Sequence, residues 1–130
     1  MSELVKVFNI NPVAASRPIV SKYGVRYSKA YTEWRKDFKW LVGTSTELTG
    51  TLSCTLLLYI QMPKSWSKKK KAEMNKQLHI QKPDIDNLAK AVLDGVSGSY
   101  FRDDSQIAIL HAQKYWAEEG KISMILKEIR

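Results

Sequence analysis

The chain has 130 residues, of which 26% are charged and 44% are hydrophobic. This length suits one domain with one core, and no apolar run is long enough to cross a bilayer. One cysteine, Cys54, excludes an internal disulfide and a cysteine-based zinc cluster. The segment after Met1 lacks the character of a signal peptide, so we expect a cytoplasmic protein with no membrane partner.

The charge is strongly basic and unevenly distributed. Twenty-one Lys and Arg against thirteen Asp and Glu give a net charge of +8, which favours a polyanionic partner, nucleic acid before an anionic membrane surface. Residues 17–40 carry seven basic and two acidic residues, and residues 64–82 carry seven lysines and one acid. Residues 83–110 reverse this balance with five aspartates, an arrangement expected of a protein that attracts phosphates and binds cations.

The first third of the chain predicts a strand, a loop with a hairpin, and a helix. Residues 4–10 alternate as a strand does, and the following loop is broken by Pro12, Pro18 and Gly24, with a short hairpin at residues 22–24. Ser28 is a good N-cap for a helix. At helical spacing after it, one apolar face contains Tyr31, Trp34, Phe38, Leu41 and Val42.

The remainder predicts a long strand, two helices and two further strands. The apolar strand 51–62 ends at Pro63, and residues 63–78 form a loop and a polar helix capped by Ser65 or Ser67. A second helix runs from about residue 86 to 96, and strands 105–116 and 121–129 are joined as a hairpin. Because strands and helices are segregated, we expect an α+β fold, one domain over residues 1–130 with helices packed on a mixed sheet.

Carboxylates gather in the segment KPDIDNLAKAVLDG, residues 82–95. Asp84 and Asp86 are two residues apart, so in extended chain both side chains project from the same face. Asp86 stands where the N-cap of the second helix is expected, and the helix dipole favours a carboxylate there. Lys90 follows Asp86 by four residues and lies beside it on the helix, and Asp94 is four residues further.

A second acidic pair, Asp103 and Asp104, directly precedes the strand that begins near residue 105. If the helix start and the strand start meet, three or four carboxylates come together. Such a cluster of oxygen ligands suits Mg²⁺ or Mn²⁺. With a lysine beside it, the cluster suits hydrolysis of a phosphodiester.

A purely structural interpretation is also open at this point. Asp86 is then only a helix cap, Asp84 a turn residue, and Asp103 and Asp104 part of a solvated loop. The pair Asp86–Lys90 would be an exposed ion pair that stabilises the helix by ~0.3–0.5 kcal/mol.

The longer pattern KPDIDNLAKAVLDGV followed by YFRDDSQI resembles the RusA-type Holliday junction resolvases, or crossover junction endodeoxyribonucleases. That family has a P-D-x-D-N-x-x-K segment, a hydrophobic helix containing an Asp, and a D-D-x-Q strand start, all present here in order within residues 82–107. The resemblance implies a Mg²⁺-dependent homodimer, with Mn²⁺ as a possible substitute, that makes paired symmetric nicks in four-way DNA junctions during recombination and repair. It assigns the metal to Asp84, Asp86 and Asp104, and the essential lysine to Lys90.

In the same resemblance, Asp94 and Asp103 match recurrent positions and are treated as supporting residues. His79, five residues before Asp84, is expected to be a neutral structural histidine. DNA contacts are expected from the basic segments, although any one of these side chains can instead belong to a solvated face. The expected contacts are Arg17, Lys22, Arg26, Lys68, Lys69, Lys70, Lys71 and Lys82.

Two other functions remain open from the sequence. One is a non-catalytic basic nucleic-acid-binding domain whose carboxylates are structural, and the other is a metal-dependent nuclease for flaps, replication forks or RNA. A four-way junction incubated with Mg²⁺ separates these functions from a resolvase. A resolvase makes paired symmetric nicks, a binding domain makes no nicks, and the other nuclease makes single nicks in flaps or cleaves RNA.

Overall fold

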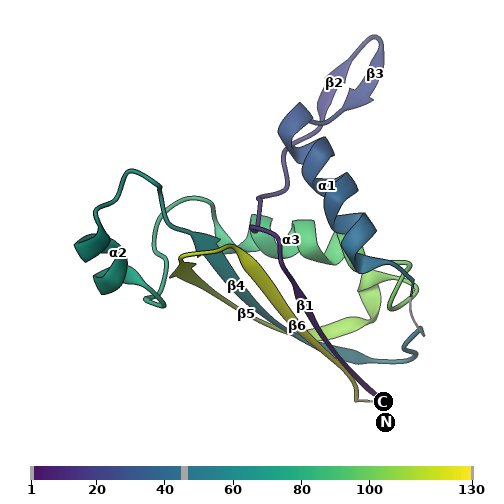
Figure 1. The fold of residues 1–130 in the computed structure, drawn as a ribbon. Helices are drawn as coiled ribbons and strands as arrows, with labels where there is room; N and C mark the ends of the chain where they lie inside the picture. The colour runs from purple at the N-terminus through teal and green to yellow at the C-terminus, as the bar shows by residue number, and fades with distance from the viewer. Residues whose placement is uncertain (1, 45–46, 130) are drawn as a thin grey trace.

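The computed structural model describes residues 2–44 and 47–129, and its centre is a four-stranded mixed sheet with the order β1-β6-β4-β5 (Figure 1). The strands are β1 (Glu3–Phe8), β4 (Leu52–Gln61), β5 (Ile107–Ala117) and β6 (Lys121–Glu128). β6 pairs antiparallel with β1 and with β4, whereas β4 and β5 are parallel. The predicted α+β class with a mixed sheet is confirmed.

The predicted hairpin between the last two strands is wrong, because β4 lies between β5 and β6. Tyr59 of β4 is opposite Tyr115 of β5 on one side and Lys121 of β6 on the other. β4 alternates buried with half-buried residues along nearly its whole length, so it suits a central position with neighbours on both sides. β5 has exposed residues along much of its first half and occupies the edge.

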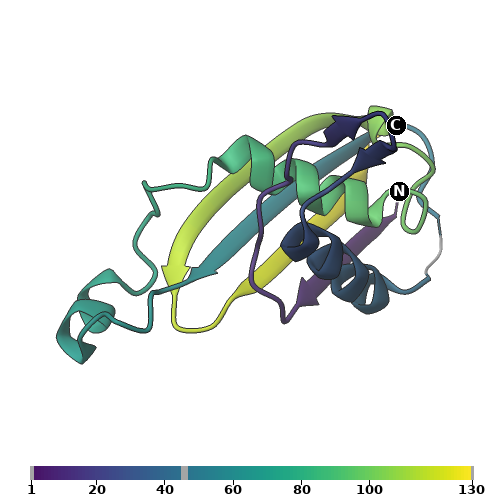
Figure 2. The ribbon, with the colours of Figure 1, turned by 90° about the horizontal axis from the view of Figure 1, so that it is seen from above.

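Helices α1 (Lys29–Val42) and α3 (Ile85–Val96) lie side by side over one face of this sheet (Figure 2). Ser28 caps α1 as predicted, its hydroxyl accepting the N–H of Tyr31 at 3.3 Å. Leu41, expected on the apolar face, is instead 39% exposed. Between helices and sheet lies a core that includes Phe8, Phe38, Leu56, Leu58, Leu88, Val92, Tyr100, Phe101, Met124 and Leu126.

Two segments project from this two-layer body (Figure 1). The hairpin of β2 (Ile19–Ser21) and β3 (Gly24–Arg26) stands above the start of α1, at the predicted place. The short helix α2 (Lys68–Met74) lies beyond the far end of the sheet, and Ser67 is its cap. In the described part of the chain, no helix is both long enough and apolar enough to span a bilayer.

The segment carrying α2 is anchored to the sheet by aromatic packing. The rings of Trp66 and His79 lie 4.7 Å and 4.0 Å from the ring of Trp116 on β5. His79 is 3% exposed, and this burial, with the nearby charge of Lys114, lowers its pKa. A neutral, structural His79 agrees with the expectation from sequence.

The contact between α1 and α3 depends on Gly95. A Cβ atom at this position would lie 2.4 Å from the ring of Phe38, which is fully buried. Ala is normally favoured over Gly inside a helix by about 1 kcal/mol. We expect Gly95→Ala to have the opposite effect and to lower the free energy of unfolding by about 1–3 kcal/mol through overpacking.

Urea denaturation of the parent and of Gly95→Ala measures this effect. The matched comparison is a double-mutant cycle with Phe38→Leu, which removes the clashing ring and should shrink the cost of Gly95→Ala. An unchanged cost in the Phe38→Leu background would show that the contact is not the cause.

Candidate active site

Helix α3 begins close to the edge strand β5, and its cap differs from the prediction. The N-cap is Asp84 rather than Asp86, which lies in the first turn. The carboxylate of Asp84 makes no capping hydrogen bond and is instead bound by Lys82 Nζ at 2.9 and 3.1 Å. This hydrogen bond and the charge of Lys82 lower the pKa of Asp84, with a smaller contribution from Lys114. The Asp84 side chain is about half exposed and has no capping role in the helix.

Lys90 pairs with Asp94 rather than with Asp86, at a distance of 3.1 Å between Nζ and Oδ2. The hydrogen bond and charge of Asp94 raise the pKa of Lys90, and Asp104 adds to the shift. The purely structural interpretation expected an ion pair between Asp86 and Lys90, but the structure pairs Lys90 with Asp94.

Lys90, Asp94, Asp103 and Asp104 line one cleft of about 430 Å³ together with Pro18 and Tyr27, which flank the β2–β3 hairpin. Tyr31 and Arg35 of α1 also line this cleft, and Arg35 is a residue that the sequence reasoning missed. The Arg35 guanidinium lies 5.1 and 5.6 Å from the ring centres of Tyr27 and Tyr31. Asp84 and Asp86, at the other end of α3, are not among the residues that line this cleft.

The sequence DDSQ folds as a capped turn that gives its residues different roles. The carboxylate of Asp103 accepts the Ser105 N–H at 3.2 Å and the Ser105 hydroxyl. The Gln106 side chain accepts the Asp103 N–H at 3.0 Å and donates to the Gly50 carbonyl at 3.1 Å. Asp103 and Gln106 thus build the turn, and the hydrogen bonds to Ser105 lower the pKa of Asp103. Asp104 is exposed.

The carboxylates have the chemistry that a hard divalent cation prefers, oxygen donors with room for water. Within residues 2–44 and 47–129, however, no group of three or more His, Cys, Asp or Glu side chains is close enough to hold a metal ion. The assignment of Asp84, Asp86 and Asp104 to one metal stays a prediction.

A second residue that sequence reasoning missed is Lys114 on β5. Its ammonium donates to the carbonyl oxygens of Gln81 and Pro83 at 2.7 and 2.8 Å, and its own carbonyl accepts the His79 N–H at 2.9 Å. These bonds tie the segment directly before Asp84 to the sheet edge. No motif marks a single lysine in a strand, so only the folded chain reveals this contact.

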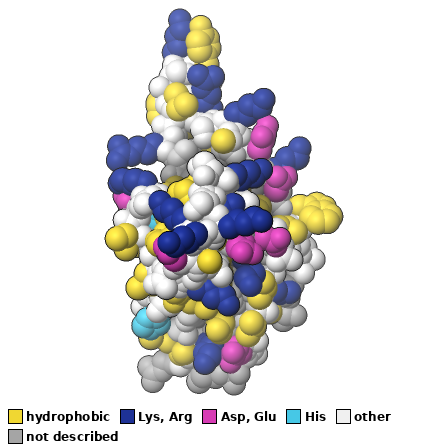
Figure 3. Space-filling model, turned by 60° about the vertical axis from the view of Figure 1, so that its left-hand side comes forward, with side chains coloured by type: hydrophobic (Ala, Val, Ile, Leu, Met, Phe, Trp, Pro, Cys, Tyr) yellow, Lys and Arg dark blue, Asp and Glu magenta, His cyan; other side chains and the backbone are white. Residues whose placement is uncertain are grey.

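The predicted DNA contacts occupy several places on the molecule. Lys22 and Arg26 lie on the projecting hairpin with Arg17 just before it, and Lys68 to Lys71 form the start of α2. Lys82 is 85% exposed and paired with Asp84. Figure 3, in which the left side of Figure 1 comes forward, shows many Lys and Arg side chains with a few acidic ones among them.

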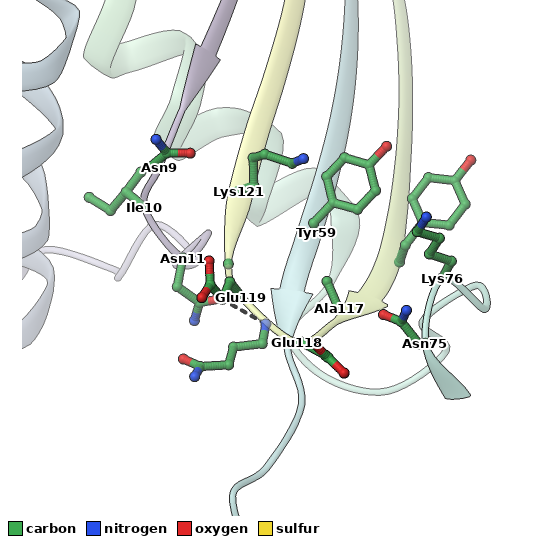
Figure 4. A pocket seen from close by; sticks show the side chains of 13 residues that line it. Asn9, Ile10, Asn11, Tyr59, Asn75, Lys76, Ala117, Glu118, Glu119 and Lys121 are labelled. Atoms are coloured by element: carbon green, nitrogen blue, oxygen red, sulfur yellow. Dashed lines mark hydrogen bonds between the residues drawn. The ribbon is translucent and has the colours of Figure 1, made fainter. Parts of the chain in front are cut away.

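A cavity of about 850 Å³ lies at the end of β5 opposite the DDSQ turn, and Figure 4 shows the residues that line it. Its walls include Asn9, Tyr59, Lys121 and the turn 118–120, and they contain none of the predicted site residues. The Asn11 carboxamide oxygen accepts the Gln61 N–H there at 2.8 Å, joining two strand ends. The carboxylate chemistry of α3 therefore lies outside this cavity.

Comparison with known proteins shows the family of this chain. Residues 9–127 match the family model of endodeoxyribonuclease RusA, and the chain belongs to that family. The family consists of nucleases that act on DNA junctions and generally depend on divalent metal. The chain is also similar to the uncharacterized protein YqaN of Bacillus subtilis (strain 168), with 32% identity over 132 positions covering 91% of each chain.

The two carbonyl contacts of Lys114 predict that Lys114→Met loosens the segment before Asp84. Removing the charged donor leaves two main-chain acceptors unpaired, and we expect the free energy of unfolding to fall by about 1–3 kcal/mol. Amide hydrogen exchange in residues 79–84 should accelerate. Lys121→Met is the control, because the Lys121 ammonium contacts only the Tyr59 ring, at 5.1 Å, among the described contacts. Unchanged exchange in Lys114→Met would refute the tethering role.

Proposed function

We propose that this chain is a Holliday junction resolvase, a Mg²⁺-dependent endonuclease that makes paired symmetric nicks in four-way DNA junctions during recombination and repair. The observation that carries the proposal is the set of exposed carboxylates along α3 and the DDSQ turn, beside Lys90, in a chain of the RusA family. Asp84 is especially suited, because it is the N-cap residue of α3 but its carboxylate makes no capping hydrogen bond.

Asp84, Asp86 and Asp104 would hold the metal, with Mn²⁺ as a possible substitute, and Asp94 and Asp103 support them. When bound, Mg²⁺ supplies Lewis acidity at the scissile phosphate and lowers the pKa of water. Lys90 is held protonated by Asp94, so it presents positive charge to the phosphate or orients the attacking water. Asp94 fixes the position of the Lys90 ammonium, and Asp103 fixes the turn that presents Asp104.

DNA binding is proposed to use the two projecting basic segments. The hairpin carries Lys22 and Arg26, and α2 begins with a run of four lysines, Lys68 to Lys71. Arg17 and Lys82 are proposed to contact phosphates between these segments, with Lys82 exchanging Asp84 for DNA when metal binds. Tyr23 at the hairpin tip is 88% exposed and lies beside Lys22, so the tip offers an aromatic ring together with charge.

Substituting the carboxylates tests the proposed site. We expect Asp84→Asn and Asp104→Asn to lower Mg²⁺-dependent nicking of a synthetic four-way junction by about 10²-fold or more, with junction binding retained. Asp37→Asn, an exposed carboxylate of α1, is the matched control and should cut like the parent.

Three outcomes of this assay decide between the candidate functions. A variant at Asp84 or Asp104 that cuts as well as the parent overturns the site assignment. A parent that binds the junction without nicking it is a non-catalytic nucleic-acid-binding domain. A parent that makes single nicks in flaps, forks or RNA is the other kind of nuclease.

Substitutions in the hairpin test how DNA is bound. We expect Lys22→Ala/Arg26→Ala to weaken junction binding and to reduce the slope of log K against log salt by about 0.9 for each phosphate that the hairpin no longer neutralises. Lys127→Ala, at the far end of β6, should leave both quantities unchanged. A double variant with the parent's affinity and slope would place the hairpin outside the DNA interface.

A further inference from the structure

The cleft shared by α1, α3 and the DDSQ turn contains a guanidinium that forms no ion pair within the described part of the chain. Arg35 lines this cleft together with Lys90 and Asp104. The ion pairs among the described residues are all made by lysine side chains. The Arg35 guanidinium instead lies 5.1 and 5.6 Å from the ring centres of Tyr27 and Tyr31. An arginine that stacks on aromatic rings keeps its N–H groups available for an anion.

The same cleft is lined by a residue whose buried hydroxyl has no hydrogen-bond partner. Ser16 lines the cleft, and its Oγ is the one buried side-chain oxygen or nitrogen of the described residues that makes no hydrogen bond. Hydrogen bonds hold its loop at both ends. The Ala15 N–H donates to the Asn87 carbonyl of α3 at 3.0 Å, and the Trp34 Nε1–H of α1 donates to the Asn11 carbonyl at 2.8 Å. Proteins pair nearly all such buried groups, so an unpaired hydroxyl in a cleft indicates a ligand.

The charges of the cleft make an anion dependent on a cation. Three carboxylates and two basic side chains line it, so acidic groups are in excess, and one divalent cation reverses that balance. Asp94 is paired with Lys90, and Asp103 accepts hydrogen bonds within its own turn. The Asp104 carboxylate has no partner of either kind among the described residues, so it is the group of this cleft that is free for a cation.

We propose that this cleft binds a backbone phosphate that flanks the scissile phosphate on the cut DNA strand, with Arg35 and Ser16 as its ligands. A guanidinium donates two parallel N–H bonds to phosphate oxygens, and the hydroxyl adds a third donor. A change of χ1 rotamer turns the Ser16 hydroxyl into the cleft that Ser16 already lines. This inference deepens the proposed function and rests on it, because only a nuclease has a cut strand.

The place of the cleft along α3 favours a flanking phosphate over the scissile one. Lys90 and Asp94 line the cleft, whereas Asp84 and Asp86, the proposed metal ligands of this helix, stand at its other end. At about 1.5 Å per residue, Asp86 and Asp94 are roughly 12 Å apart along the helix axis. Successive phosphates of one strand are spaced by about 3.4 Å along the duplex axis. The metal ligands and Arg35 therefore suit different phosphates of the same strand.

Substitution of Arg35 tests the site through binding rather than cutting. Fluorescence anisotropy measures the affinity for a four-way junction in Mg²⁺, with Asp84→Asn present in every chain to keep the junction intact. We expect Arg35→Ala to raise the dissociation constant by about 10-fold and to reduce the slope of log K against log salt by about 0.9. Lys36→Ala is the matched control, because Lys36 is the next residue of α1, is exposed and does not line the cleft. Parental affinity and slope in Arg35→Ala would overturn the proposal.

Neutral phosphate analogues identify the phosphate that Arg35 contacts. Junctions that each contain a single methylphosphonate near the crossover remove one backbone charge at a time. At one position, the parent should lose about as much affinity as Arg35→Ala loses on unmodified DNA, and Arg35→Ala should lose almost nothing further. Equal losses in both proteins at every position would show that Arg35 contacts no phosphate.

The unpaired hydroxyl gives an independent test that does not depend on Arg35. We expect Ser16→Ala to weaken junction binding by about five-fold and to unfold at the same or a higher urea concentration than the parent. The reason is that the substitution removes a buried polar group that the free chain leaves unpaired. Ser123→Ala, part-buried on β6, is the control and should bind DNA like the parent. A less stable Ser16→Ala with parental DNA affinity would assign Ser16 a structural role and remove it from the site.

Nicking assays separate the failure of this inference from the failure of the proposed function. If Arg35 and one phosphate are coupled but the parent never nicks a junction, the proposed function fails and the phosphate site stands. If the parent nicks junctions while Arg35→Ala and Ser16→Ala bind and cut as it does, the proposed function stands and the phosphate site fails.

Discussion

The parallel pairing of β4 with β5 is the constraint on which the candidate site depends. Two parallel neighbouring strands begin at the same end of a sheet, so the chain that connects them must run back along the full length of the strands. That return contains α3, so the helix is held over the sheet with its N-terminus near the end of β5. The DDSQ turn before β5 then comes back beside α3. Lys90, Asp94 and Asp104 therefore line one cleft, whereas Asp84 and Asp86 stand at the other end of α3.

The acidic side chains of α3 and of the DDSQ turn make different contacts. The carboxylate of Asp103 accepts hydrogen bonds within its own turn, and the carboxylate of Asp94 pairs with Lys90. Asp84 is the N-cap residue of α3, but its carboxylate pairs with the Lys82 ammonium instead of capping the helix. A helix start without its cap bond gives up about 1 kcal/mol of stabilisation. Such a departure from local consistency is typical of a functional position, because it keeps a carboxylate available. The same contrast explains why two adjacent aspartates, Asp103 and Asp104, need not have equivalent roles.

Much of the fold could be predicted from periodicity and caps, because those signals are local. Ser28, Pro63 and the apolar stripe from Tyr31 to Val42 mark their elements correctly, apart from Leu41. The order of the strands could not be predicted, because a short turn after Ala117 is compatible with two arrangements. β5 and β6 can pair as a hairpin, or β4 can lie between them, as it does here. Lys114 and Arg35 were missed for a related reason: their partners, two carbonyls and two tyrosine rings, are defined only by tertiary packing.

The two faces of the sheet differ in what they bury. The helix-covered face of the sheet encloses the core. The carboxylates of α3 and the basic residues of the β2–β3 hairpin and of α2 lie outside this core, in contact with solvent. The face of the sheet that no helix covers keeps Val5 and Val7 more than half exposed. One small sheet thus holds α3 and the DDSQ turn on its helix-covered side, where the candidate carboxylates lie.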